Sequence, residues 1–245
     1  MTVPVRPQEV EETMLKQTSR RLVLAGALAM AAWPALANHP GENLDERMLE
    51  MEKYFQPIEG EQAPGFKLQD AEGRPVGLSE LQDKVVVLHF IYASCPDVCP
   101  LHADKIATIQ ESINASPMGD MVEFVSITTD PANDTPNILR DYAGWHDLDT
   151  ANWTFLTTRP DQPEDTTRAL ASDYGVEFTM SAESDAMMHA PVTFVIDRGG
   201  RLAAKFHGME FQNANLVLYV SGLINNAQHR HEEEGWWHTL TNVFR

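Results

Sequence analysis

The stretch from Lys84 to Tyr92 constrains the fold more than any other part of this chain. It is almost continuously apolar and rich in β-branched residues, which is typical of a central strand buried on both faces of a sheet. The two cysteines of the chain, Cys95 and Cys99, follow shortly afterwards, and each stands directly before a proline. Because a residue before proline is biased away from helical dihedrals, we expect both cysteines on an exposed loop, with Cys99 capping the next helix.

Predicted helices and strands alternate on both sides of this run. The predicted helices are 44–54, 100–113, 136–145, 164–174 and 214–227. The predicted strands are 66–68, 76–78, 84–92, 122–128, 153–156, 193–196 and 202–206. The order predicts an α/β fold with a central mixed sheet flanked by helices and an N-terminal β-hairpin.

The first 37 residues have the composition of an export signal. Basic residues precede an apolar stretch at 22–33, and Ala35-Leu36-Ala37 offers a small-x-small cleavage site. Arg20-Arg21 also resembles the core of a twin-arginine signal. We therefore expect an exported, periplasmic protein, which would be anchored in the membrane if the segment stayed uncleaved.

The remainder of the chain is expected to comprise three parts. Residues 38–62 are polar and acidic and predict a flexible arm, residues 63–228 a folded domain, and residues 229–245 a polar and aromatic tail. Trp236-Trp237 in that tail fits either a docking or membrane-surface patch or packing against the domain. The formal net charge of −18 makes nucleic acid a poor partner, since its phosphates would repel the chain.

An isolated Cys-x3-Cys pair indicates either a redox dithiol or a soft-metal site. In an oxidising compartment the pair forms a disulfide unless a reductant or a metal intervenes, and the spacing permits that bond. A purely structural disulfide would add little stability because the loop it closes is short. Zinc fits less well, because a structural zinc site takes four ligands. Asp97 could supply a fourth ligand, although we expect it to orient the loop.

The stretch from Phe90 to Pro100 resembles the signature of the Sco/SenC family, which delivers copper to the binuclear copper site of cytochrome c oxidase. Further segments agree with the family pattern over roughly residues 60–225, namely 65–81, 125–131, 134–136, 153–156 and His189 ahead of Asp197. The resemblance implies a thioredoxin-like fold. It also implies that Cys95, Cys99 and His189 bind copper, as Cu(I) or Cu(II), for transfer to an oxidase subunit. Thiolates with an imidazole suit soft Cu(I).

A second resemblance favours redox chemistry. The stretch from Pro191 to Asp197 resembles that of exported thioredoxin-like reductases, whose proline is cis and packs against the dithiol. The alternative function is therefore a thiol–disulfide oxidoreductase that reduces a partner's cysteines, with Cys95 attacking and Cys99 resolving; another thioredoxin-like reductase would then be a further partner. A peroxidase is disfavoured, because the Thr-x-x-Cys environment of peroxiredoxins is absent.

The remaining soft-ligand side chains are expected to be structural. The methionines around His189 could help to receive copper, but we expect them to fill apolar gaps. The methionines in question are Met180, Met187 and Met188. His89 is predicted to be a hydrogen-bonded core residue. His102 lies one turn beyond Cys99 and could tune the pKa of its thiol, but we expect His102 to be solvated. No specific metal site is expected from the remaining histidines, which are His39, His229, His231 and His238.

Overall fold

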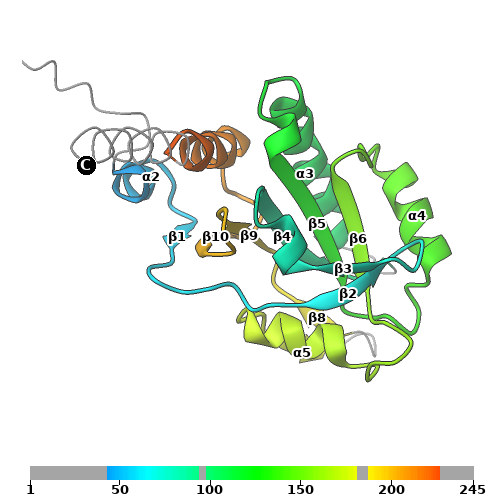
Figure 1. The fold of residues 1–245 in the computed structure, drawn as a ribbon. Helices are drawn as coiled ribbons and strands as arrows, with labels where there is room; N and C mark the ends of the chain where they lie inside the picture. Colours follow the sequence, from blue (N-terminus) through cyan, green and yellow to red (C-terminus); the bar gives the residue numbers. More distant parts are fainter. Residues whose placement is uncertain (1–42, 94–97, 181–186, 227–245) are drawn as a thin grey trace, which may run out of the picture. The chain divides into compact units, whose positions relative to one another are not determined.

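The structure is a computed structural model that describes residues 43–93, 98–180 and 187–226, all within the unit His39–Arg245. In this part of the chain an eight-stranded mixed sheet has the order β1-β10-β9-β4-β5-β6-β2-β3 (Figure 1). Its strands are β1 (Phe55–Pro57), β2 (Lys67–Asp70), β3 (Pro75–Gly77), β4 (Val85–Ile91), β5 (Val122–Thr128), β6 (Trp153–Thr157), β9 (Val192–Ile196) and β10 (Leu202–His207). A separate antiparallel pair is formed by β7 (Phe178–Met180) and β8 (Met187–His189).

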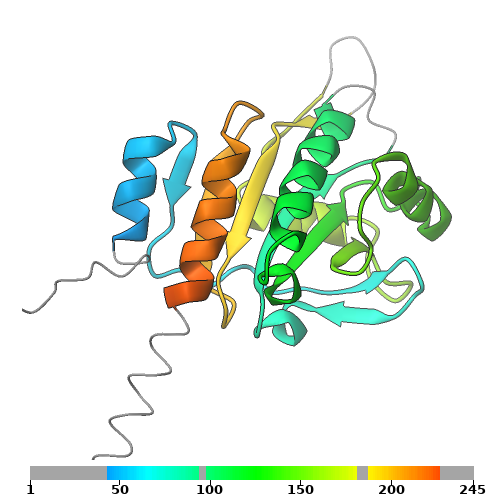
Figure 2. The same cartoon turned by 90° about the horizontal axis from the view of Figure 1, so that it is seen from above.

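Helices cover both faces of the large sheet. They are α2 (Leu44–Met51), α3 (Val98–Asn114), α4 (Pro136–Trp145), α5 (Thr166–Asp173) and a last helix at 213–226, with short 3-10 turns η2 (Leu78–Leu81) and η3 (Gly119–Met121). The last helix and α3 lie side by side on one face, and α5 lies on the other (Figures 1 and 2). The α/β prediction is confirmed, including the β2–β3 hairpin near the N-terminus of the domain.

Strand β4 lies in the middle of the sheet, as its composition predicts. All of its residues are buried. It pairs in parallel with β5 on one side and antiparallel with β9 on the other. Because side chains alternate along a strand, Val85, Val87 and Ile91 face α3 and the last helix, whereas Val86, Leu88 and Phe90 face α5. The strand therefore supplies the core on both faces.

Local sequence signals fix the ends of several elements. Thr135 caps α4 by accepting a hydrogen bond from the amide of Ile138 at 3.5 Å, and Pro136 occupies the first helical position. Helix α3 begins at Val98, two residues before the predicted start at Pro100. This start is compatible with Pro100, since the first amides of a helix have no partner within the helix in any case.

Residues 44–57 are packed, whereas the composition of the region predicts a flexible arm. Strand β1 pairs antiparallel with β10, which places Phe55 opposite Phe206 and buries it. The carboxylate of Glu52 is buried and accepts hydrogen bonds from the Gln212 amide at 2.9 Å and the Asn215 side chain at 2.8 Å. These bonds tie the segment to the start of the last helix.

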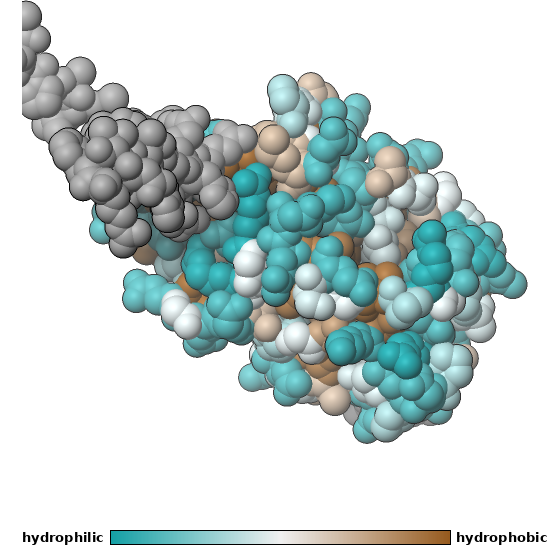
Figure 3. Space-filling model, viewed as in Figure 1, coloured by the Kyte–Doolittle hydropathy of each residue, from teal (hydrophilic) through white to brown (hydrophobic). Residues whose placement is uncertain are grey.

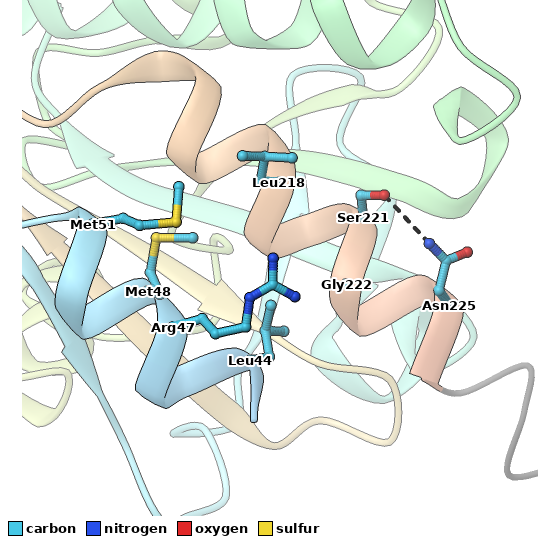
Figure 4. Close-up of a pocket in the computed structure, with 8 residues that line it drawn as sticks. All are labelled: Leu44, Arg47, Met48, Met51, Leu218, Ser221, Gly222 and Asn225. Atoms are coloured by element: carbon cyan, nitrogen blue, oxygen red, sulfur yellow. Dashed lines mark hydrogen bonds between the residues drawn. The ribbon is translucent and has the colours of Figure 1, made fainter. Parts of the chain in front are cut away.

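Helix α2 approaches the last helix closely at Gly222 (Figure 4). A Cβ atom at Gly222 would lie 2.6 Å from Cδ1 of Leu44, so any larger residue here would require the Leu44 side chain to move. The face in Figure 3 is largely hydrophilic, in keeping with the acidic composition.

Candidate metal centre

The predicted cysteine loop leaves the sheet at the carboxyl end of β4. Ile91, Tyr92 and Ala93 are described, and α3 then begins at Val98. Cys95 and Asp97, one predicted ligand and one predicted loop-orienting residue, lie outside the described residues. The site is therefore characterised by the two ends of the loop and by the residues that hold them.

Cys99 lies inside the first turn of α3 and is only 3% exposed, whereas the sequence predicts an exposed N-cap. Its side chain packs with Tyr92, so the strand end and the helix start contact each other. Its backbone carbonyl accepts a hydrogen bond from the hydroxyl of Tyr142 on α4 at 3.1 Å. These tertiary contacts outweigh the local preference of a residue before proline for extended dihedrals.

The first turn of α3 also provides a favourable electrostatic environment for a thiolate. The unpaired amides at a helix N-terminus carry a partial positive charge, which stabilises anions located there. Burial removes most of the competing water from Cys99. A sulfur in this position suits metal coordination or thiol exchange.

Asp134 anchors the other end of the loop. Its side chain is 1% exposed, and its Oδ2 accepts hydrogen bonds from the amide of Ala93 at 2.9 Å and from the hydroxyl of Thr128. Burial raises the pKa of Asp134 above its usual value, and the nearby carboxylate of Asp130 acts in the same direction, while the two hydrogen bonds oppose them. The carboxyl group thus joins the end of β5 to the residue that leads into the cysteine loop.

His189 lies at the end of β8, opposite Phe178 in the register of the small sheet. Its backbone belongs to this strand, and its side chain is outside the description. Its chain continues through Ala190 and Pro191, joined by a trans peptide bond, into β9. The cis geometry of the reductases that Pro191 resembles is therefore absent at this bond.

The sheet register brings the segment after His189 close to the carboxyl end of β4, where the cysteine loop begins. Strand β9 runs antiparallel to β4, with Thr193 opposite His89. The residues that precede Thr193 therefore approach the end of β4 from which the cysteine loop departs. Segments far apart in the sequence thus meet at one edge of the sheet, as the candidate ligand set requires.

Both core histidines near this edge are buried. His89 is 0% exposed, and its Nε2 lies 3.1 Å from Oγ of Ser126, so the prediction of a core histidine is confirmed. His102 is 2% exposed, and its Nε2 lies 2.9 Å from Oγ1 of Thr193. The prediction that His102 is solvated is wrong, because His102 lies on the inner face of α3 and finds its partner on β9.

Other predicted residues are placed only in part. The backbones of Met180 and Met187 pair with each other between β7 and β8, and Met188 pairs with Thr179. The side chains of these methionines are outside the description. Four histidines and two tryptophans lie entirely outside the described residues, namely His39, His229, His231, His238, Trp236 and Trp237. Within the described ranges, no group of three or more His, Cys, Asp or Glu side chains could hold a metal ion.

Two grooves lie on the surface of the described part of the chain. One is a small groove of about 150 Å³ between α2 and the last helix, lined by Met51, Leu218 and others (Figure 4). The other is a wide groove of about 720 Å³ along α3 and the end of α4, where Nδ1 of His146 lies 2.5 Å from Asp104. Cys99 lines neither of them. None of the helices in the described part of the chain is long and apolar enough to cross a membrane.

The model of the SCO1/SenC family matches residues 57–224 of this chain. The chain belongs to the SCO1/SenC family. Among curated relatives, the SCO1 protein homolog of Bacillus subtilis is 28% identical over 154 residues, which covers 63% of this chain and 77% of the relative.

Solved structures of the family share the fold. BsSco, described as a member of the Sco family of cytochrome c oxidase assembly proteins that has a disulfide switch, aligns with a TM-score of 0.59 at 22% identity, over 69% of this chain and 95% of its own. ScoI of Bradyrhizobium japonicum with copper bound aligns with a TM-score of 0.54 at 23% identity, over 66% of this chain and 98% of its own. These likenesses establish a Sco-type, thioredoxin-like fold.

Proposed function

We propose that this protein is a copper metallochaperone that holds one copper ion through Cys95, Cys99 and His189. The observation that carries the proposal is the meeting of two segments at one sheet edge. The start of α3, with Cys99, and the strand that follows His189 both lie at the carboxyl end of β4. Membership of the SCO1/SenC family supports the same assignment.

The residue types suit monovalent copper. Two thiolates and one imidazole are soft enough for Cu(I), and the three ligands leave the ion accessible to an acceptor. The buried position of Cys99 limits access of water to one sulfur, and the N-terminus of α3 favours its anionic form. The copper-bound structure of a similar ScoI supports copper as the metal.

The recipient is proposed to be a respiratory copper enzyme such as cytochrome c oxidase, because BsSco and its family are described as assembly proteins for that enzyme. Delivery would take place outside the cytoplasm, because residues 1–37 have the pattern of an export signal. The segment would act as an anchor if it remained attached.

Oxidation of the cysteine pair would control copper loading. Formation of the Cys95–Cys99 disulfide releases two electrons and two protons to an oxidant and leaves neither sulfur available as a thiolate. Only the dithiol form can therefore take copper. Copper loading that persists after complete oxidation of the pair would overturn this part of the proposal.

The test is a Cu(I) titration of the reduced protein against a competing chelator. One equivalent of Cu(I) should bind, and both His189→Ala and Cys99→Ser should lower the affinity at least about tenfold, which corresponds to about 1.4 kcal/mol per lost ligand. His207→Ala is a matched control, because His207 lies on β10 and hydrogen-bonds to Gln56. The control should bind like the wild type.

The same variants distinguish the alternative function. A thiol–disulfide oxidoreductase would keep most of its thiol exchange in His189→Ala and would lose it in Cys99→Ser. A reduced protein that retains no Cu(I) but reduces disulfides of a partner would favour the oxidoreductase and refute the chaperone.

A further inference from the structure

A row of buried polar side chains crosses the sheet beneath α3. Thr193 on β9, His89 on β4 and Ser126 on β5 are each 0% exposed and occupy neighbouring positions in the strand register. Trp153 on β6 extends the row by donating from Nε1 to Ser126 Oγ at 2.8 Å. Burying so many polar groups is unfavourable unless they are hydrogen-bonded, so the row calls for a physical explanation.

One bond of this row connects the sheet to α3. His102 projects from the inner face of the helix, and its Nε2 lies 2.9 Å from Oγ1 of Thr193. The two residues are 91 positions apart in the sequence, and both are buried. The rings of His102 and His89 also lie 4.9 Å apart, which places His102 over the strand row.

The location of this bond relates it to both halves of the candidate site. His102 lies three positions after Cys99, hence on the same face of α3 and about one turn away. Thr193 lies four positions after His189, on the strand that continues the histidine segment. The bond therefore joins the element that carries Cys99 to the element that follows His189.

The hydrogen bond between His102 and Thr193 depends on direction, unlike the contacts around it. The surrounding contacts between α3 and the sheet are made by Ala103, Ile106, Ile109 and Ile113, which are buried apolar residues. Apolar packing tolerates small shifts of a helix along or around its axis, because the hydrophobic effect is not directional. A hydrogen bond restricts both distance and angle.

We propose that the His102–Thr193 hydrogen bond is a positioning link that sets the distance between Cys99 and His189 for copper binding. His102 and Thr193 are thus positioning residues, and neither binds the metal. The proposal rests on the proposed function, because it assigns this role relative to the copper ligands.

The test is a double-mutant cycle on Cu(I) affinity. Thr193→Val removes the hydroxyl and retains the shape of the side chain, whereas Thr193→Ser keeps the hydroxyl. We expect Thr193→Val to weaken Cu(I) binding about tenfold and Thr193→Ser to stay within about twofold of the wild type, because only the valine removes the hydrogen bond. In a His189→Ala background, Thr193→Val should have no further effect beyond about twofold.

Ser126→Ala is the matched control. Ser126 is equally buried and belongs to the same row, but its bonds go to His89 and Trp153 within the sheet. It should lower stability without changing Cu(I) affinity. A second readout needs no metal: in the metal-free protein, amide hydrogen exchange in the first turns of α3 should accelerate in Thr193→Val and stay unchanged in Ser126→Ala.

The outcomes separate the two proposals. If the wild type binds Cu(I) and Thr193→Val weakens it equally with and without His189, the bond supports the fold in general and the positioning role is refuted. Equal affinity losses in Thr193→Val and Ser126→Ala would refute it as well. If the wild type binds no Cu(I), or if His189→Ala leaves the affinity unchanged, the proposed function or its ligand set fails, and this inference fails with it.

Discussion

Asp134 provides the sharpest test of how the cysteine loop is held. Two donors converge on its Oδ2, the amide of Ala93 and the hydroxyl of Thr128, and the carboxyl group is 1% exposed. Asp134→Ala would leave both donors without this acceptor. A buried donor without a partner costs about 1–3 kcal/mol, so the variant should lose about 2–4 kcal/mol of unfolding free energy.

Asp134→Asn should behave differently, because both bonds end on one oxygen and an amide oxygen can accept both. It also removes the buried charge. Since burial raises the pKa of Asp134, the folded state holds the proton more tightly than the unfolded state. Stability of the wild type therefore falls as pH rises from the unfolded pKa through the raised folded pKa. The advantage of Asp134→Asn over the wild type should grow over that window and then stay constant.

Urea unfolding from pH 4 to 8, followed by circular dichroism, measures these differences. Asp141→Asn serves as the control, because Asp141 is an exposed carboxylate on the same helix as Tyr142. The difference between Asp134→Asn and the wild type should depend on pH, and it should exceed the effect of Asp141→Asn at pH 7. A pH-independent difference for Asp134→Asn, or a loss as large as that of Asp134→Ala, would refute the reasoning.

Three further predictions concern packing within the domain. Burial, the largest single influence, acts to raise the pKa of Glu52, but hydrogen bonds hold that pKa below its usual value. Glu52→Gln should therefore cost about 1–2 kcal/mol of unfolding free energy at pH 7, measured by urea unfolding. The cost should shrink as pH falls through the folded pKa. Gly222→Ala places a Cβ 2.6 Å from Cδ1 of Leu44 and forces that side chain to move, while alanine gains about 1 kcal/mol over glycine inside a helix, so the net change in stability should stay within about 1 kcal/mol; in a Leu44→Ala background the same substitution should stabilise by about 1 kcal/mol, and equal effects in the two backgrounds would contradict the close approach. Tyr142→Phe removes the hydroxyl that donates to the carbonyl of Cys99 and should lower the melting temperature by about 2–4 °C in calorimetry; an unchanged value would show that the bond adds nothing.

The sequence predicts the elements whose causes are local. The apolar run that forms β4 identifies the central strand, and Thr135 followed by Pro136 identifies the start of α4. The resemblance to the Sco/SenC family is confirmed by the family model, and it places Cys99 and His189 on segments that the register brings to one edge.

What the sequence leaves undetermined depends on distant partners. Cys99 packs against Tyr92 at the end of β4, and Tyr142, which lies on another helix, holds its backbone carbonyl. The partner of His102 is 91 residues away, so no local pattern distinguishes this histidine from a solvated one. The packing of β1 likewise depends on β10, which is formed near the end of the domain.

The antiparallel pairing of β4 with β9 has a consequence for the order of events during biogenesis. Strands β4, β5 and β6 lie close together in the sequence and can associate early, whereas β9 joins only after a long loop closes. In a chain that has formed only β4, β5 and β6, the thiols of Cys95 and Cys99 are present, but the imidazole of His189 has not yet been brought next to them. Under the proposed ligand set, a newly exported molecule would hold the ion at full affinity only after β9 has joined the sheet, which disfavours loading of immature copies.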